Sequence, residues 1–228
     1  ENFMRNYCSY YISSTEGSDQ NNGLSPETPW KTFAPAGKLR ARGGDRLLLK
    51  CGDVWQEPLC LTDCHGSASL PFILSSYGEG ARPSVRRYSG KVPMRAEERC
   101  VILNDVYGIV ISGLDIGHAG VGIELIYNDS YDREYVLVED CHFHDIYGTT
   151  QIDNVPTLAF SSALVVGGNR TQVGRDRYIL LRGLHIHRCT TYDAGSLLGY
   201  SNGFDNSGAA EHCPSLENVT ITDCICES

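Results

Sequence analysis

Short stretches of alternating apolar and polar residues recur along the second half of the chain. Four segments align without gaps on one pattern: apolar-x-apolar, two turn residues, then apolar-x-apolar. They begin at Ile109, Val136, Ile179 and Val219. Alternation with a period of two is typical of strands, and the two turn residues mark a bend. The pattern therefore predicts repeated pairs of short strands joined at corners.

A third apolar stretch follows each of the first three segments, at residues 121–126, 163–166 and 196–199. Three strands per repeat are typical of the triangular coil of a parallel β-helix. The repeats are offset by 27, 43 and 40 residues (136−109, 179−136 and 219−179). Because a bare coil needs roughly 20–25 residues, we expect insertions within residues 148–160, 169–177 and 200–217, where solenoids often build a binding face.

The alignment also predicts which side chains stack inside the solenoid. Successive coils lie about 4.8 Å apart, so each inward position forms a continuous file. The three expected files are Ile111, Val138, Leu181, Ile221; Leu114, Cys141, Leu184, Cys224; and Ile116, Phe143, Ile186, Cys226.

Upstream of these repeats, residues 46–53 and 70–78 are expected to form earlier strands. A short helix within residues 31–42 would cover the end of the core, because exposed terminal strands need a cap. We expect one domain over residues 1–228, with residues 1–45 as the cap region and 46–228 as coils. The sequence stops at Ser228 in the middle of a coil, so we expect a longer natural chain or a second chain that completes the helix.

Several short motifs near the start of the chain resemble the opening of secreted bacterial right-handed parallel β-helix proteins, the pectate-lyase-like superfamily. They are residues 10–13 (YYIS), 17–19 (GSD), 22–32 (NGLSPETPWKT), 44–50 (GDRLLLK), 52–55 (GDVW) and 76–78 (SYG). The resemblance implies an all-β solenoid, a secreted or cell-surface location, and a polysaccharide or oligosaccharide as partner. The superfamily includes lyases, hydrolases, epimerases, tailspikes and adhesins, so the fold alone selects no reaction.

Charge and hydropathy remove two classes of partner. The net charge is −9, and no basic stripe suits nucleic acid. No apolar run approaches the roughly 20 residues of a membrane span. Arginines do gather in one stretch, and Arg170 and Arg188 are candidates to hold an acidic sugar; the alternative is that they are solvated loop charges.

The ten cysteines leave three interpretations open: buried thiols, disulfides or a metal site. Buried thiols are favoured, because Cys141, Cys224 and Cys226 fall in the expected core files. Zinc is poorly supported, since the pair Cys60 and Cys64 has no matching second pair.

Polar columns on the outer face supply the candidate chemistry. The alignment stacks Asp115 with His142 and His185, and His144 with His187 in the next column but one. Such ladders are either a plain polar surface or an acid–base and substrate-contact cluster, since histidine titrates near neutral pH. The following column contains His118, Asp145 and Arg188.

Cleavage of a glycosidic bond needs two carboxylates, about 5–5.5 Å apart for retention and 6.5–9.5 Å for inversion. Carboxylates one or two coils apart match these distances, and the candidate pairs join Asp145 to Asp193, Glu124 or Asp205. His118, Tyr200 and Phe204 are candidate sugar contacts. We therefore predict a glycoside hydrolase or polysaccharide lyase with a groove on the side of the helix; the alternative is a glycan-binding β-helix without catalysis.

We predict no required cofactor, with calcium as the one metal to consider. Lyases of this superfamily often use calcium to neutralise an acidic sugar. The oxygen-rich set Asn128, Asp129, Asp132 and Glu134 would suit that ion, and a solvated turn is the alternative.

Overall fold

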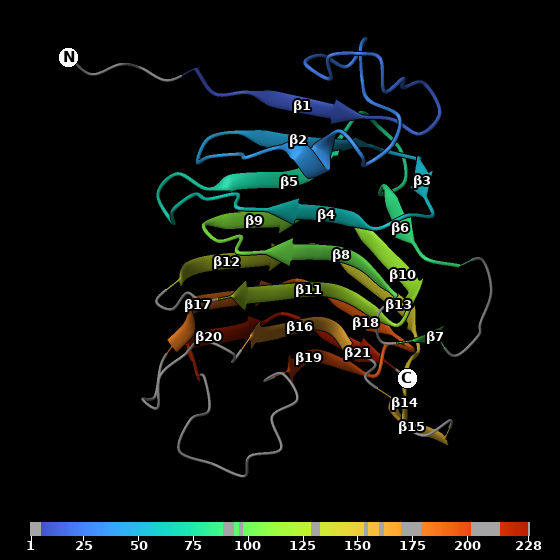
Figure 1. Cartoon of the computed structure of the whole chain (residues 1–228), viewed down its shortest axis with the longest axis vertical. Helices are drawn as coiled ribbons and strands as arrows, with labels where there is room; N and C mark the ends of the chain where they lie inside the picture. The colour runs from blue at the N-terminus through green and yellow to red at the C-terminus, as the bar shows by residue number, and fades with distance from the viewer. Residues whose placement is uncertain are drawn as a thin grey trace.

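The chain winds into a right-handed parallel β-helix whose coils stack along its long axis (Figure 1). This computed structural model describes residues 6–88, 94–95, 98–128, 133–152, 155–159, 162–169, 179–201 and 215–227. Within them lie 21 strands and one 3₁₀ turn. Three parallel sheets form the sides of the coils, as the three-strand repeat predicts.

The first sheet has seven strands, each hydrogen-bonded to the equivalent strand one coil further on: β1 (Ser9–Ile12), β2 (Arg46–Lys50), β5 (Phe72–Tyr77), β9 (Ile109–Ser112), β12 (Arg133–Glu139), β17 (Ile179–His187) and β20 (Ser215–Thr222). The second sheet has six: β3 (Val54–Trp55), β6 (Ser84–Arg86), β10 (Asp115–Ala119), β13 (His142–Ile146), β18 (Thr190–Tyr192) and β21 (Ile225–Glu227).

The third sheet contains the apolar stretches that close each coil: β4 (Leu59–Thr62), β8 (Arg99–Asn104), β11 (Val121–Asn128), β16 (Ser162–Asn169) and β19 (Ser196–Ser201). A fourth sheet has three short strands: β7 (Met94–Arg95), β14 (Gly148–Ile152) and β15 (Val155–Ala159). The antiparallel β14–β15 pair occupies the insertion expected at residues 148–160.

The corner between the first and second sheets uses the left-handed backbone region. Gly113, Asp140, Arg188 and Asp223 all have φ between 49° and 70° there. Short polar side chains tolerate this region better than most non-glycine residues. The residue that follows each corner turns inward, which produces the file Leu114, Cys141, Cys189, Cys224.

The predicted register of the third repeat is wrong by five residues. Leu184 pairs with Val136 in the first sheet, whereas the alignment had paired it with Cys141 at the corner. Residues 179–188 do repeat the apolar pattern, but they form one nine-residue strand, β17. The corner comes only at Arg188. The observed files are Ile111, Val138, Ile186, Ile221 and Ile116, Phe143, Thr191, Cys226.

Both registers bury apolar side chains from residues 179–187, so local alternation does not distinguish them. The continuation does: in the observed register Cys189 and Thr191 also enter the core, at 0% and 6% exposure. The repeat pattern thus predicted the architecture correctly and misplaced one coil within it.

An N-terminal segment covers the first coil, in line with the expected cap. Trp30 and Phe33 are buried there; Trp30 stacks on Tyr10, and Phe33 stacks on Trp55. The helix expected within residues 31–42 is only a 3₁₀ turn, Ala36–Lys38, because Leu39 already adopts an extended conformation. β1 lies inside the expected cap region but pairs with β2 as part of the first sheet.

The last described coil leaves apolar side chains exposed. Val219 and Ile221 are 38% and 49% accessible, although their partners in the preceding coil, Leu184 and Ile186, are buried. The expectation that further chain or a second chain covers this end stays a prediction.

No helix in the described part of the chain is long and apolar enough to cross a bilayer.

The cysteines in the described ranges are all free thiols. Four of them are buried, Cys64, Cys100, Cys141 and Cys189. Burial raises the pKa of the Cys100 thiol to about 12. Cys213 lies outside the described residues. Small apolar thiols filling the core agree with the favoured interpretation.

A buried carboxylate attaches the cap to the coils and generates a stability prediction. Asp53 accepts hydrogen bonds from the hydroxyls of Ser13 and Thr15, each at 2.7 Å. Burial alone would raise the pKa of Asp53, but these bonds outweigh it and lower the pKa below its ordinary value of 3.8. Asp53→Asn should therefore reduce the free energy of unfolding at pH 7 by about 2 kcal/mol.

Denaturant unfolding between pH 2 and pH 7 measures this effect. A carboxyl with a lowered pKa stabilises the fold above its unfolded-state pKa and loses that effect as pH falls through its folded-state pKa. The difference between wild type and Asp53→Asn should therefore shrink below about pH 4. Asp63→Asn, at a half-exposed carboxylate, is the matched control. A constant difference across this range would contradict the assignment.

Candidate functional site

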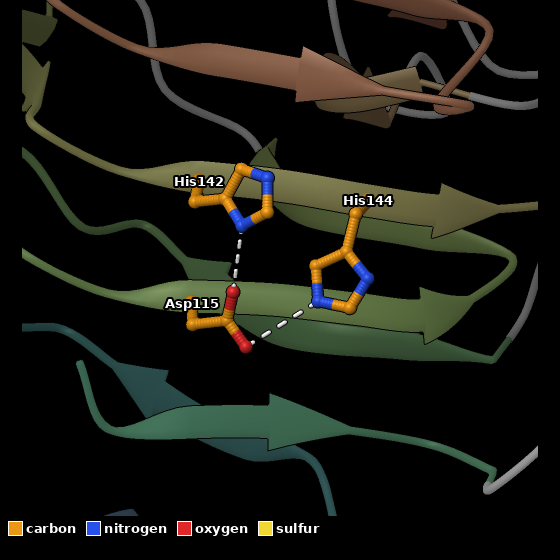
Figure 2. Close-up of side chains that lie close together, drawn as sticks. All are labelled: Asp115, His142 and His144. Atoms are coloured by element: carbon orange, nitrogen blue, oxygen red, sulfur yellow. Dashed lines mark hydrogen bonds and ion pairs between the residues drawn. The ribbon is translucent and has the colours of Figure 1, made fainter. Parts of the chain in front are cut away.

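Imidazole and carboxylate side chains gather on the outer surface of the second sheet, where β10 and β13 lie side by side (Figure 2). Ile116 and Phe143 face the core with 0% exposure. Side chains alternate along a strand, so Asp115, His142 and His144 face outward. In the parallel pairing of β10 and β13, His142 lies directly across from Asp115.

Asp115 is the centre of this cluster. The Nδ1 atom of His142 lies 2.9 Å from its Oδ1, and the Nε2 atom of His144 lies 3.3 Å from its Oδ2 (Figure 2). Ser84 Oγ donates a further bond to Oδ2 at 2.8 Å, and Arg86 Nη2 lies 3.8 Å away. Burial opposes ionisation, but the bonds from His144, Ser84 and His142 outweigh it and hold the pKa of Asp115 far below its usual range.

His144 connects two carboxylates. Its Nε2 faces Asp115, and its Nδ1 lies 2.8 Å from Asp145 Oδ2. The bond to Asp115 is the largest influence and raises the pKa of His144; burial opposes this, and Asp145 adds to it. The ring lies over Gly117, where a Cβ atom would come within 2.7 Å of Nε2. Any larger residue at position 117 would collide with the ring, so Gly117 provides the space in which His144 packs.

Asp145 belongs to a column of residues with left-handed backbone: His118, Asp145 and Asp193 have φ of 49°, 51° and 54°. His118 Nε2 lies 3.9 Å from Asp145 Oδ2, and burial lowers the pKa of His118. The Tyr147 hydroxyl donates to Oδ2 of Asp193, which lies in the next coil. Ile146 N donates to the Asp193 carbonyl at 3.0 Å, so Asp145 and Asp193 lie in adjacent coils.

The expected ladders of His142 with His185 and of His144 with His187 are absent. His185 and His187 lie on β17 in the first sheet, where they bond Thr220 and Thr222 of β20. The second-sheet neighbour of His144 in the next coil is Tyr192. The five-residue shift of the third repeat causes this difference.

Arg188 is likewise separate from His118 and Asp145. It occupies the corner between the first and second sheets, where its Nε donates to Asp140 Oδ1 at 2.8 Å. Asp193 takes the place that the alignment had given to Arg188 in that column. The structure therefore brings together His118, His144, Asp145 and Asp193, and places His187 and Arg188 elsewhere.

Glu124 lies on β11 in the third sheet. Its Oε2 is 2.5 Å from Arg99 Nε on β8. Burial raises the pKa of Glu124, and Arg99 opposes this shift. Its described partner is thus in its own sheet, and Glu124 is not a member of the histidine–carboxylate cluster.

Several predicted residues lie outside the described ranges or are described by their backbone alone. Arg170, Phe204 and Asp205 lie outside, as do Asp129 and Asp132 of the suggested calcium loop. The backbones of Asn128 and Tyr200 belong to β11 and β19, and Glu134 lies on β12. The roles suggested for all of them stay predictions.

Two residues of this region were not among the sequence-based site candidates, Ser84 and Arg86, and Tyr147 was considered only as an aromatic that could stack on a sugar ring. Ser84 and Arg86 come from β6 (Ser84–Arg86), which is too short to show the repeat pattern. Tyr147 directly follows β13, so its nearness to Asp145 is local. Its bond to Asp193 appears only when the coils stack.

Three donor atoms converge in each of two overlapping sets within the described residues. One set is Asp115, His142 and His144, and the other is His118, His144 and Asp145. In each set, all donor atoms lie within 4.8 Å of one another. Each arrangement can share protons among its members or hold a cation.

Comparison with known proteins gives a short sequence match and a fold match over most of the chain. No protein-family profile matches the sequence. A lacto-N-biosidase from Bifidobacterium longum subsp. longum is 34% identical over 73 residues, which are 31% of this chain and 5% of that protein. Two crystal structures of a GH136 lacto-N-biosidase from Eubacterium ramulus, native and selenomethionine-labelled, superpose with TM-scores of 0.68 and 0.72.

The structural matches cover 95% and 96% of this chain, at 16% and 15% identity. The chain is a right-handed parallel β-helix. This confirms the fold that the resemblance implied. The chain spans only 40–41% of the length of the solved lacto-N-biosidase.

The position of His144 between two carboxylates generates a prediction about stability. His144→Leu removes both hydrogen bonds and leaves Asp115 and Asp145 without this common partner. Breaking a half-buried charged network should lower the free energy of unfolding at pH 7 by about 2–3 kcal/mol. Urea denaturation measures it.

Two further variants make this prediction specific. In the Asp115→Asn background, His144→Leu should cost less, because residues of one network are not additive. His185→Leu removes an outward histidine bonded to a threonine and should cost no more than about 0.5 kcal/mol. Equal losses for His144→Leu and His185→Leu would refute the bridging role.

Proposed function

We propose that this chain is part of a carbohydrate-active enzyme that hydrolyses glycosidic bonds, with its substrate on the outer face of the second sheet and the adjoining corner. One observation carries the proposal: Asp145 and Asp193 occupy equivalent left-handed positions in adjacent coils. The sequence match to one lacto-N-biosidase and the fold match to another support a glycan as the substrate class.

The two carboxylates have different partners, which suits a division of roles. Asp145 accepts a hydrogen bond from the imidazole of His144 and lies near that of His118. Asp193 accepts a bond from the neutral hydroxyl of Tyr147. In glycosidases, different surroundings keep one carboxyl group ionised and the other protonated. Asp145 acts as the anion, and Asp193 as the proton donor.

The reaction follows from these roles. Asp193 gives its proton to the glycosidic oxygen as the bond to the anomeric carbon breaks, and Asp145 attacks that carbon. Water, deprotonated by Asp193, then releases the sugar from Asp145. Adjacent coils lie about 4.8 Å apart, which is close to the carboxyl separation of about 5–5.5 Å in retaining enzymes. The released sugar should therefore keep its anomeric configuration.

Activity on a glycan panel tests the proposal. The full chain is incubated with nitrophenyl glycosides, including the lacto-N-bioside, and with polysaccharides. Release of nitrophenol or of new reducing ends is expected, without the ultraviolet absorbance of an unsaturated uronate that a lyase would produce. Asp145→Asn and Asp193→Asn should each lower kcat at least about 100-fold, with melting curves close to wild type.

Asp223→Asn is the matched control. Asp223 also has a left-handed backbone, but its side chain is 74% exposed at the other corner. This variant should keep full activity. Binding of glycans without turnover by the wild type would favour a non-catalytic binding protein instead. Turnover that survives both Asp145→Asn and Asp193→Asn would refute the site.

A further inference from the structure

We propose that Asp115, His142 and His144 form a binding site for a transition-metal cation of the zinc type, on the outer face of the second sheet. This inference does not depend on the proposed hydrolysis. It concerns the outward side chains of β10 and β13, which lie between the corners of the coil (Figure 2). Neither the resemblance to other β-helices nor the repeat pattern assigns a metal to these residues.

The donor atoms have the right chemistry. Two imidazole nitrogens and one carboxylate oxygen are the ligand set of many zinc sites that keep a position open for water or substrate. Calcium and magnesium prefer oxygen ligands alone, so this set favours a borderline metal such as Zn²⁺. His142 Nδ1 and His144 Nε2 are the nitrogens that face the carboxylate of Asp115.

The spacing of the donors also fits. Zinc bonds of about 2.0–2.1 Å with tetrahedral angles separate neighbouring ligand atoms by about 3.3 Å. The carboxylate oxygens of Asp115 lie 2.9 Å from His142 Nδ1 and 3.3 Å from His144 Nε2. All three donors fall within 4.8 Å of one another. A cation can therefore bind them with small side-chain movements.

The surroundings hold the ligands as metal sites do. The other ring nitrogen of His144, Nδ1, donates to Asp145 at 2.8 Å, and a histidine–carboxylate contact of this type orients metal-binding imidazoles. Ser84 donates to Asp115. The side chain of His142 is 37% exposed, which leaves a path for an ion to enter. The Arg86 guanidinium, 3.8 Å from Asp115, opposes a cation and should weaken binding.

Zinc binding by the metal-free full chain tests the site, without any substrate. Isothermal titration with Zn²⁺ should show one equivalent that Asp115→Asn and His142→Ala each weaken at least about 100-fold. Asp145→Asn should keep the equivalent but weaken it about 10–100-fold, as loss of an orienting partner does. Arg86→Gln should tighten it several-fold.

His185→Ala is the control, because His185 is an outward histidine on the first sheet; it should bind zinc like the wild type. Cysteine thiols are a second potential zinc site, and Co²⁺ distinguishes them. The equivalent lost in His142→Ala should show the visible bands of cobalt with nitrogen and oxygen ligands, without the near-ultraviolet band of a cobalt–thiolate bond.

Either of two results would overturn the site: unchanged zinc affinity in folded Asp115→Asn and His142→Ala, or a thiolate band in the equivalent that they remove. Glycan hydrolysis by a wild type that binds no zinc would refute this metal site and leave the proposed function standing. Zinc binding without any glycan hydrolysis would support this metal site and refute the proposed function.

Discussion

Stacking of equivalent residues in successive coils is the constraint on which the rest of the structure depends. No single coil can bury its apolar face alone, so each side chain that points inward needs another directly above or below it. Ile116 and Phe143 illustrate this, since they pair across β10 and β13 and are wholly buried. The same register that stacks them inside necessarily stacks Asp115 and His142 outside.

The outer cluster is thus a consequence of the inner packing. Strand alternation turns two neighbouring positions to opposite faces, and the spacing of about 4.8 Å between strands is short enough for direct hydrogen bonds between side chains. His144 bonds Asp115 because β13 lies beside β10, and it bonds Asp145 because Asp145 is the next residue in the chain. A fold of this kind can therefore build a charged site from residues that are 30 positions apart in sequence.

The corners contribute in a different way. Left-handed backbone at His118, Asp145 and Asp193 turns the chain from the second sheet toward the third. Short polar side chains suit that conformation, so the corners present polar groups on consecutive coils. The proposed carboxylate pair and the proposed metal site adjoin each other because Asp145 lies on β13, the strand that also supplies His142 and His144.

The sequence by itself determined the architecture: the three-strand repeat, the inward files up to Phe143, the insertion at residues 148–160 and the nearness of His118 to Asp145. Local alternation is enough for these, because strand period and turn chemistry are properties of neighbouring residues. Tertiary structure alone decided the register of residues 179–188, where two alignments bury equally apolar residues. Only stacking showed that Asp193, not Arg188, lies beside Asp145, and that Tyr147 meets Asp193 across a coil. Those contacts depend on how many residues each coil contains, which no short segment of the chain encodes.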